Sequence, residues 1–281
     1  MDIEALKTHI DKIDKISDKN WKDSLNSRKL KELEFHDKDR DESFKNNFEL
    51  NDTYEKFYGN RKYYKITKRS SQYVHNWIKT KSKDKVFLDY ACGNGANAIL
   101  AAESCASLSL GLDISNVSII NAKTISAKKG IKNIKFFQAD AENTKLPNDS
   151  IDVIVCSGML HHLDLSYAFY ELRRILKPGG IILAVEALDY NPAIKLYRLL
   201  TPLMRTEWEK AHILSLKDID FAKRYFSIGK VRYWHITGYL AGKFPILFNL
   251  LEKIDKVLEK IPLINLLAWI FTFELIKPKD K

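Results

Sequence analysis

The sequence has few cysteines, no leader pattern and no apolar run long enough to cross a bilayer. Its three cysteines are scattered, at Cys92, Cys105 and Cys156. This spacing excludes a disulfide framework and a zinc site, so we expect no bound metal and a reducing, cytoplasmic compartment. The start Met1-Asp-Ile-Glu4 is neither basic nor apolar, which predicts no signal peptide. The apolar run at residues 261–276 is interrupted by Pro262 and falls short of the roughly 20 residues of a spanning helix.

The chain has 281 residues and a formal charge of +10, and the basic excess lies outside its middle third. Residues 1–85 carry 21 basic and 16 acidic side chains, residues 86–189 carry 9 and 11, and residues 190–281 carry 16 and 9. Such an excess attracts nucleic acids, anionic membranes or acidic substrates. The amino-terminal charges alternate in sign, as in Asp37-Lys-Asp-Arg-Asp-Glu42, which is typical of a solvated helix. With no RNA-binding motif in the sequence, we expect no nucleic-acid partner.

An apolar run that ends in an acid and a glycine turn is the most informative segment. Val86-Phe-Leu-Asp-Tyr90 has the composition of a buried strand, and Ala91-Cys-Gly-Asn-Gly95 follows it before an alanine-rich helix. Glycines let the backbone approach a ligand closely, and the helix N-terminus offers free N–H groups. The pattern predicts a nucleotide site at the end of a strand.

Two kinds of nucleotide fit this turn. Gly93-Asn-Gly-Ala-Asn-Ala98 matches the dinucleotide fingerprint, with Asp113 about 20 residues further on, so an NAD-dependent dehydrogenase is one candidate. Asp89 argues against it, because a carboxylate at the strand end repels a pyrophosphate and attracts a cation. S-adenosylmethionine (SAM) carries an ammonium and a sulfonium but no phosphate. Asp140 ends a third apolar run, where an adenine amino group can be received.

Strand and helix patterns alternate through the middle of the chain. The predicted strands are residues 86–90, 108–113, 134–138, 151–156 and 181–186, with helices between them. This order predicts an α/β fold with a doubly wound parallel sheet. Residues 1–85 show apolar positions at helical spacing and predict a helical front segment or lid. We therefore divide the chain into residues 1–85, the core at 86–189 and residues 190–281.

The ordered motifs of this core resemble those of class I SAM-dependent methyltransferases, most closely the small-molecule branch (methyltransferase type 11-like). Besides the glycine turn, the matching segments are Gly111-Leu-Asp-Ile-Ser115, Gln138-Ala-Asp140, Leu146-Pro-Asn-Asp-Ser-Ile-Asp-Val-Ile-Val155, Leu160-His-His-Leu163 and Leu176-Lys-Pro-Gly-Gly180. The resemblance implies a seven-stranded, mostly parallel Rossmann-like sheet with an antiparallel last strand. Residues 230–236 and 269–277 are then the last two strands, and residues 190–228 and 237–268 are helical lid insertions. Ala91 departs from the family, which more often has glycine there.

The resemblance also implies roles for individual residues in binding SAM. Asp89 would lie near the methionine amino group, Asp113 would bind the ribose hydroxyls and Asp140 would accept from the adenine amino group. The remaining cofactor residues are those of the turn, the adenine surround and the floor of the site: Ala91, Cys92, Gly93, Gly95, Ile114, Ala141, Ser157 and Gly158. For Asp113 and Asp140 alone, a helix N-cap is the competing interpretation.

A hydroxyl acceptor needs a base that takes its proton as it attacks the methyl group. His161 and His162 follow the fourth predicted strand, and His161 is the first candidate because it is closer to the cofactor floor. Glu186, at the end of the fifth strand, and His212, in the lid, are weaker candidates. Packing or capping of the next helix is the alternative role of the two adjacent histidines.

The sequence thus predicts a SAM-dependent methyltransferase for a small-molecule acceptor, with O-methylation of a sugar, polyketide or lipid-linked intermediate first. C-methylation of a quinone-like ring comes next. A nucleic-acid methyltransferase, a non-catalytic SAM-binding subunit and the dehydrogenase stay as alternatives. Cys156-Ser-Gly-Met-Leu160 lacks the Asn/Asp-Pro-Pro-aromatic signature of amino-methylating enzymes. The basic, apolar carboxyl-terminal lid also suggests peripheral contact with a membrane.

Overall fold

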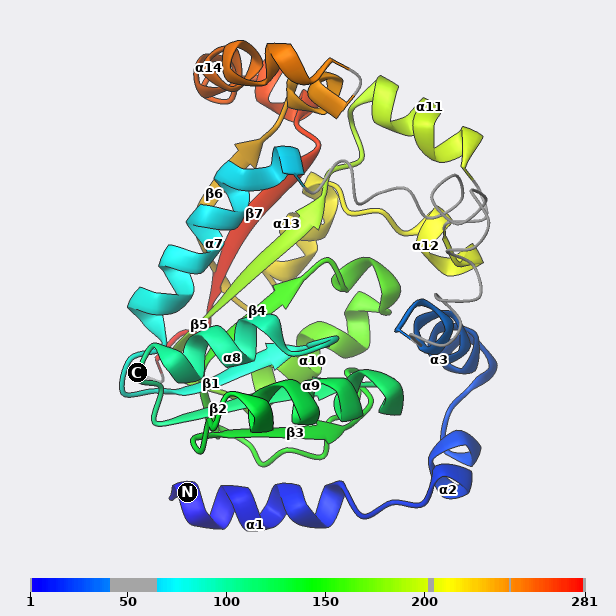
Figure 1. Cartoon of the computed structure of the whole chain (residues 1–281), viewed down its shortest axis with the longest axis vertical. Coiled ribbons are helices and arrows are strands. Elements are labelled where there is room, and N and C mark those ends of the chain that lie inside the picture. The colour runs from blue at the N-terminus through cyan, green and yellow to red at the C-terminus, as the bar shows by residue number, and fades with distance from the viewer. Residues whose placement is uncertain (1, 41–64, 202–204, 243, 280–281) are drawn as a thin grey trace.

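The computed structural model describes residues 2–40, 65–201, 205–242 and 244–279, which include one seven-stranded sheet (Figure 1). Its strands run in the order β3-β2-β1-β4-β5-β7-β6. Their bounds are β1 Val86–Tyr90, β2 Leu108–Asp113, β3 Ile134–Gln138, β4 Ile151–Ser157, β5 Leu176–Ala187, β6 Ser227–Trp234 and β7 Ile270–Ile276. Strands β1 to β5 pair in parallel, and β7 is antiparallel to both β5 and β6. The predicted mostly parallel sheet with an antiparallel last strand is confirmed.

Alternate residues of the central strands point to two separate cores, which is why these strands are apolar throughout. On one face Phe87 and Val153 pack with helices α7 (Lys68–Lys81) and α8 (Ala96–Glu103), and α9 (Asn116–Lys128) continues this layer. On the other face Leu88 and Ile154 pack with α1 (Ile3–Ile13), α10 (Leu165–Ile175) and α13 (Leu216–Ala222). The chain is therefore a three-layer α/β sandwich.

The expectation of a helix between every pair of successive strands is wrong for the connection from β3 to β4. Residues 139–150 contain no helix. Helix α1 covers this part of the sheet instead, with Leu6 and Ile10 buried in the same core as Phe137. Helix α1, the first part of the predicted front segment, thus belongs to the three-layer sandwich. The part of the predicted front segment at residues 41–64 lies outside the described residues.

The remaining elements lie at the carboxyl ends of the parallel strands or beyond them. Helices α2 (Asp18–Asp23) and α3 (Ser27–Arg40) follow α1, and α3 lies beyond the ends of β1 and β4 (Figure 1). The insertions form α11 (Pro192–Leu200), α12 (Glu207–Ala211) and α14 (Phe248–Leu258). Short 3₁₀ turns complete the connections: η1 Lys65–Thr67, η2 Leu160–His162, η4 Gly238–Gly242, η5 Pro245–Leu247 and η6 Ile264–Leu267. Among the described residues, none of the helices has both the length and the apolar character needed to cross a bilayer.

Replacing Phe169 with alanine should lower the free energy of unfolding by about 3–5 kcal/mol, because a fully buried ring leaves a cavity. The ring lies on α10, among the rings of Phe221 and Phe226. Tyr170→Ala is the matched control, since the neighbouring ring is 63% exposed and its loss should cost less than about 0.5 kcal/mol. Urea unfolding monitored by circular dichroism measures both values, and equal losses would contradict the assignment of Phe169 to the core.

Candidate functional site

The three acids of the sequence motifs lie at adjacent strand ends. Asp89 is in β1, Asp113 ends β2 and Asp140 follows β3 by two residues. A pocket of about 100 Å³ opens at this edge. The predicted cofactor residues that line it are Ala91, Asp113, Ile114, Asp140, Ala141, Ser157 and Gly158. The structure thus brings together residues that are up to 67 positions apart in sequence, from Ala91 to Gly158, at one place.

Asp89 lies beneath the glycine turn and is only 2% exposed. Its carboxylate accepts hydrogen bonds from the Asn97 side chain, at 3.3 Å, and from the backbone N–H of Ala98, at 3.2 Å. Burial raises the pKa of Asp89 to about 7, because these neutral donors replace water only in part. A cationic ligand group beside this carboxylate would lower its pKa again, which suits an ammonium and opposes a phosphate.

The backbone of the turn explains its glycines and its one departure from the family pattern. Gly93 and Gly95 have φ of +51° and +81°, the left-handed region that favours glycine. A Cβ atom on Gly95 would also lie 2.6 Å from the ring of Phe136, and Arg40 Nη1 lies 2.0 Å from the place of a Cβ on Gly93. Ala91 has φ of +60°, the left-handed conformation that costs about 1–2 kcal/mol for a residue with a Cβ. Cys92 is buried behind the turn, and burial raises the pKa of its thiol well above the ordinary value.

Asp113 and Asp140 organise the pocket through backbone N–H groups. Asp113 accepts from the N–H of Gly93 at 2.8 Å and from that of Ser115 at 2.9 Å, so it ties β2 to the glycine turn. Asp140 accepts from the N–H of Glu142 at 2.9 Å. Neither carboxylate caps a helix: Ser115 caps α9, and no helix follows Asp140. The competing N-cap interpretation is wrong for both.

Helix α3 supplies a row of side chains that the sequence predictions did not identify. Arg28, Lys29, Glu32, His36 and Arg40 all line the pocket. Four of them recur at every fourth position, the spacing that places residues on one helix face. That spacing was a signal available in the sequence, but it does not reveal which surface the helix covers. Lys29 Nζ lies 2.6 Å from Asp140 Oδ2, so α3 directly contacts the acid that the sequence assigns to the adenine amino group.

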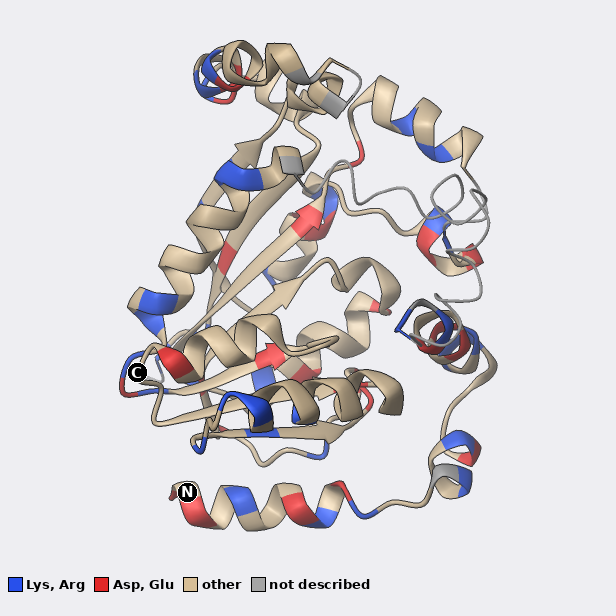
Figure 2. Ribbon diagram, in the orientation of Figure 1, with Lys and Arg blue, Asp and Glu red and all other residues tan. Residues whose placement is uncertain are grey.

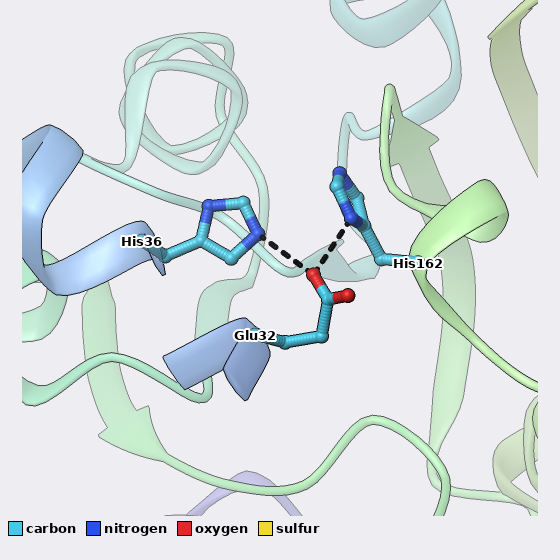
Figure 3. Close-up of side chains that lie close together, drawn as sticks. All are labelled: Glu32, His36 and His162. Atoms are coloured by element: carbon cyan, nitrogen blue, oxygen red, sulfur yellow. Dashed lines mark hydrogen bonds and ion pairs between the residues drawn. The ribbon is translucent and has the colours of Figure 1, made fainter. Parts of the chain in front are cut away.

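Figure 3 shows Glu32, His36 and His162 gathered where α3 meets η2. Glu32 Oε2 lies 2.9 Å from His162 Nδ1 and 3.8 Å from His36 Nε2. Their spacing is compatible with a metal ion. Glu32 is also hydrogen-bonded, however, because its Oε1 accepts from Thr206 Oγ1 at 2.6 Å. Burial lowers the pKa of both histidines to about 4, so they are neutral at pH 7. We assign the cluster to holding α3 against η2.

His161 and Glu186 form a buried pair beside this cluster. His161 Nδ1 lies 2.6 Å from Glu186 Oε2, and Glu186 Oε1 accepts from the N–H groups of Met159 and Leu160. Because a carboxylate only accepts, Nδ1 carries the hydrogen and Nε2 is the nitrogen available to take a proton. Nε2 lies 3.9 Å from Glu209 Oε1 on α12. This arrangement suits a general base held in one tautomer.

The charge state of His161 depends on its two carboxylate neighbours. Burial opposes protonation, but the Glu186 carboxylate outweighs it and raises the pKa of His161 above 6.5. Glu209 is also largely buried, and burial raises the pKa of that carboxyl. Arg205 lies 3.4 Å from Glu209, so the far side of His161 is lined by an ion pair.

The fourth catalytic candidate is not brought to this site. His212 is exposed at the end of α12, where its ring stacks on Trp208 at 3.8 Å and its Nδ1 lies 2.8 Å from the Trp208 carbonyl. Like His161 and Glu186, it is absent from the pocket lining. The contacts of His212 are with Trp208, and the structure does not bring it to the His161–Glu186 pair.

The comparisons with known proteins agree with this fold. A family model described as a methyltransferase domain matches residues 81–217. The uncharacterized methyltransferase YcgJ of Bacillus subtilis is 34% identical over 100 residues, or 35% of this chain and 39% of that protein. The crystal structure of YcgJ aligns with a TM-score of 0.50 at 21% identity, over 74% of this chain and 98% of that one.

Two further relatives carry names that specify different acceptors. Protein arginine N-methyltransferase 1 of Dictyostelium discoideum is 34% identical over 115 residues, or 40% of this chain and 34% of that protein. The sterol 24-C-methyltransferase ERG6B of Gibberella zeae is 31% identical over 115 residues, or 40% of this chain and 30% of that protein. The aligned segments span about a third of the length of these curated relatives.

Replacing Asp89 with asparagine should stabilise the protein without ligand at alkaline pH. The carboxyl has a pKa of about 7 when folded and 3.8 as an ordinary side chain, so folding favours its protonated form. The wild type therefore loses stability as the pH rises through 7, and the variant does not. We expect a gain of about 4 kcal/mol at about pH 8.5 and roughly half of that at about pH 5.5.

Urea unfolding at the two pH values measures this gain. Asp152→Asn is the control, because that carboxylate is partly exposed and pairs with Lys177 at 3.0 Å. The control should show no gain at either pH. A loss of stability in Asp89→Asn at alkaline pH would show that the Asp89 carboxylate is better satisfied than its two neutral donors imply.

Proposed function

We propose that this chain, which belongs to the class I SAM-dependent methyltransferases, transfers the methyl group of SAM to a hydroxyl oxygen of a small-molecule acceptor. The observation that carries the proposal is the pair His161–Glu186, which holds an imidazole in one tautomer. In sequence this imidazole lies between Met159 and His162 of the pocket lining. Such a pair is not needed for cofactor binding alone. It favours turnover over the alternative of a non-catalytic SAM-binding subunit.

The pocket residues fit SAM as a bound group. Asp89 provides the buried anion for the methionine amino group, and Arg40, over Gly93, provides a cation for the carboxylate. Asp113 keeps lone pairs for the ribose hydroxyls, and Asp140 for the adenine amino group. A dinucleotide fits less well, because its pyrophosphate would face Asp89 across the turn.

Cofactor entry requires α3 to shift. The pocket of about 100 Å³ is below the roughly 300 Å³ at which small-molecule sites begin. Lys29 Nζ occupies one acceptor position of Asp140 Oδ2, so movement of this ammonium would free that position too for the adenine amino group. Lys29 also pairs with Glu142 at 2.8 Å, which gives the ammonium a second anion when it moves. We infer that α3 closes over the cofactor after it binds.

Bound SAM supplies an electrophilic methyl carbon on a sulfonium. The chain aligns the acceptor with that carbon, and alignment supplies much of the rate increase for an in-line displacement. His161 Nε2 would take the hydroxyl proton of the acceptor, and SAM, when bound, would supply the methyl group and leave as the neutral thioether. Glu186 holds the ring through Nδ1 and stabilises the imidazolium that results, and His161 then releases its proton to water.

Replacing His161 with alanine should lower kcat roughly 100-fold or more and leave the Kd for SAM unchanged, because the base acts only during transfer. Labelled SAM in an acceptor screen measures turnover, and calorimetry measures binding. His212→Ala is the matched control and should keep full activity, because that ring is exposed and stacks on Trp208. Full turnover by His161→Ala would remove this histidine from the mechanism.

Replacing Glu186 with glutamine should shift the pH profile of kcat to lower pH. In the wild type the rate rises as His161 loses its proton, with a midpoint above 6.5 because of the Glu186 carboxylate. The variant removes that charge, so the midpoint should fall below 6.5 while the maximal rate drops. A role of Glu186 in packing alone would lower the rate without moving the midpoint.

Calorimetry should show that SAM binds the wild type and that Asp113→Ala weakens this binding by roughly tenfold or more, since the ribose hydroxyls lose a charged acceptor. Asp220→Ala, in an exposed surface pair with Lys223, is the control and should bind normally. Tighter binding of NAD than of SAM would overturn the assignment in favour of a dehydrogenase.

C-methylation is the second candidate, and similarity to a sterol 24-C-methyltransferase favours it. A carbon acceptor loses its proton after the methyl group arrives, and His161 can take that proton from the same position. Mass spectrometry of the product separates the two reactions. A methyl ether indicates O-methylation, and a methyl group stable to ether cleavage indicates C-methylation.

A further inference from the structure

The described lid elements expose an unusual amount of apolar surface. Fourteen of the twenty large apolar side chains exposed among the described residues lie between Leu196 and Leu267. Ile246 is 93% exposed, Leu263 79% and Leu199 75%. Monomeric proteins seldom expose contiguous apolar patches larger than a few hundred Å², and larger ones mark binding surfaces.

Helix α14 is apolar on its outward side as well as its inward side. Leu251 and Asp255 face inward, and Asp255 accepts from the N–H groups of Thr237 and Gly238. Leu250, Ile254 and Val257 form an outward stripe at positions i, i+4 and i+7. Because the inward face already anchors the helix, the stripe is not required for folding.

Lysines flank this stripe. Lys253, Lys256 and Lys260 are exposed and recur at three- and four-residue spacing beside the apolar positions. Figure 2 shows the upper part of the molecule as mostly tan ribbon, with blue and red on α14 and blue on α11. Two acids of the same helix and its C-cap are less available, because Asp255 is buried and Glu259 pairs with Arg69 at 2.6 Å. The exposed charge beside the stripe is therefore mainly positive, the sign that anionic lipids attract.

Helix α11 extends the same surface toward the catalytic pair. Leu196, Leu199 and Leu200 are exposed on it. Its cap, Asn191, donates to the Leu267 carbonyl at 2.6 Å, which joins α11 to η6 and the α14 region. Both lid insertions therefore contribute to one surface, which we define as the exposed apolar residues of α11 and of 244–267.

We propose that this lid surface docks on a bilayer that contains anionic phospholipids. An outward apolar stripe flanked by lysines is the pattern of a helix that lies in a membrane interface. Association with a second copy is less favoured, because two such faces would bring their lysines together. The inference goes beyond the proposed function, since docking is measured without methyl transfer.

Vesicle flotation tests the proposal with the full chain. The wild type should float with phosphatidylcholine vesicles that contain about one-third phosphatidylglycerol, and less with phosphatidylcholine alone. The double change Leu250→Asp with Val257→Asp should reduce the bound fraction roughly tenfold or more, since two apolar anchors become anions. Ile120→Asp, at a 54% exposed position on α9, is the matched control and should bind like the wild type.

A second double variant tests the proposal in case the two aspartates disturb folding. Lys253→Glu with Lys256→Glu leaves every apolar side chain in place and should reduce binding to the anionic vesicles only. Circular dichroism and SAM calorimetry on each protein separate a failure of docking from a failure of the proposed function. Absence of flotation in the wild type overturns the proposal. So does sedimentation of the wild type as a dimer that Leu250→Asp with Val257→Asp converts to a monomer.

Discussion

Buried negative charge at the carboxyl edge of the parallel sheet is the constraint on which the site depends. Asp89, Asp113 and Glu186 are buried at the ends of β1, β2 and β5, and Asp140 lies just beyond β3. Buried carboxylates are costly unless donors or cations surround them. The chain meets this demand in two ways: with N–H groups of the turns at the edge, and with cationic side chains of α3. Asp89 receives least of both, and its pKa of about 7 records the deficit.

Helix α3 therefore does two things with one row of side chains. Lys29 and Arg40 bring positive charge over the acidic edge, and Glu32 fastens the helix to His162. The same contacts narrow the pocket, so the helix that neutralises the edge also controls access to it. A cationic cofactor can replace part of this compensation, because it brings its own positive charge to Asp89. The positive charge beside the buried acids can thus come either from the side chains of α3 or from a bound cationic cofactor.

The sequence predicted the sheet and its acids because both follow from local patterns. A strand that is apolar throughout and ends in an acid before a glycine turn is typical of a nucleotide site in a parallel sheet. The three acids lie at or near the ends of their strands. The sequence did not place helix α3 at the pocket, because a charged helix face looks the same whether it faces solvent or a pocket. The contacts of His212 were not predicted for the same reason: its position in the lid gave no information on which way the ring points. Residues whose roles depend on contacts distant in sequence leave no periodic signal.

The proposed base, His161, and the lid surface are linked through one short helix, α12. Glu209 on α12 faces His161 Nε2 and pairs with Arg205, and Arg205 donates to the Thr201 carbonyl just after α11. An acceptor that reaches Nε2 must come between His161 and Glu209, so it has to displace α12 or pass beside it. Because the exposed leucines of α11 lie on the adjoining helix, contact at that surface bears directly on the route to the base. An acceptor with an apolar tail could follow this route from the lid surface with its hydroxyl group leading.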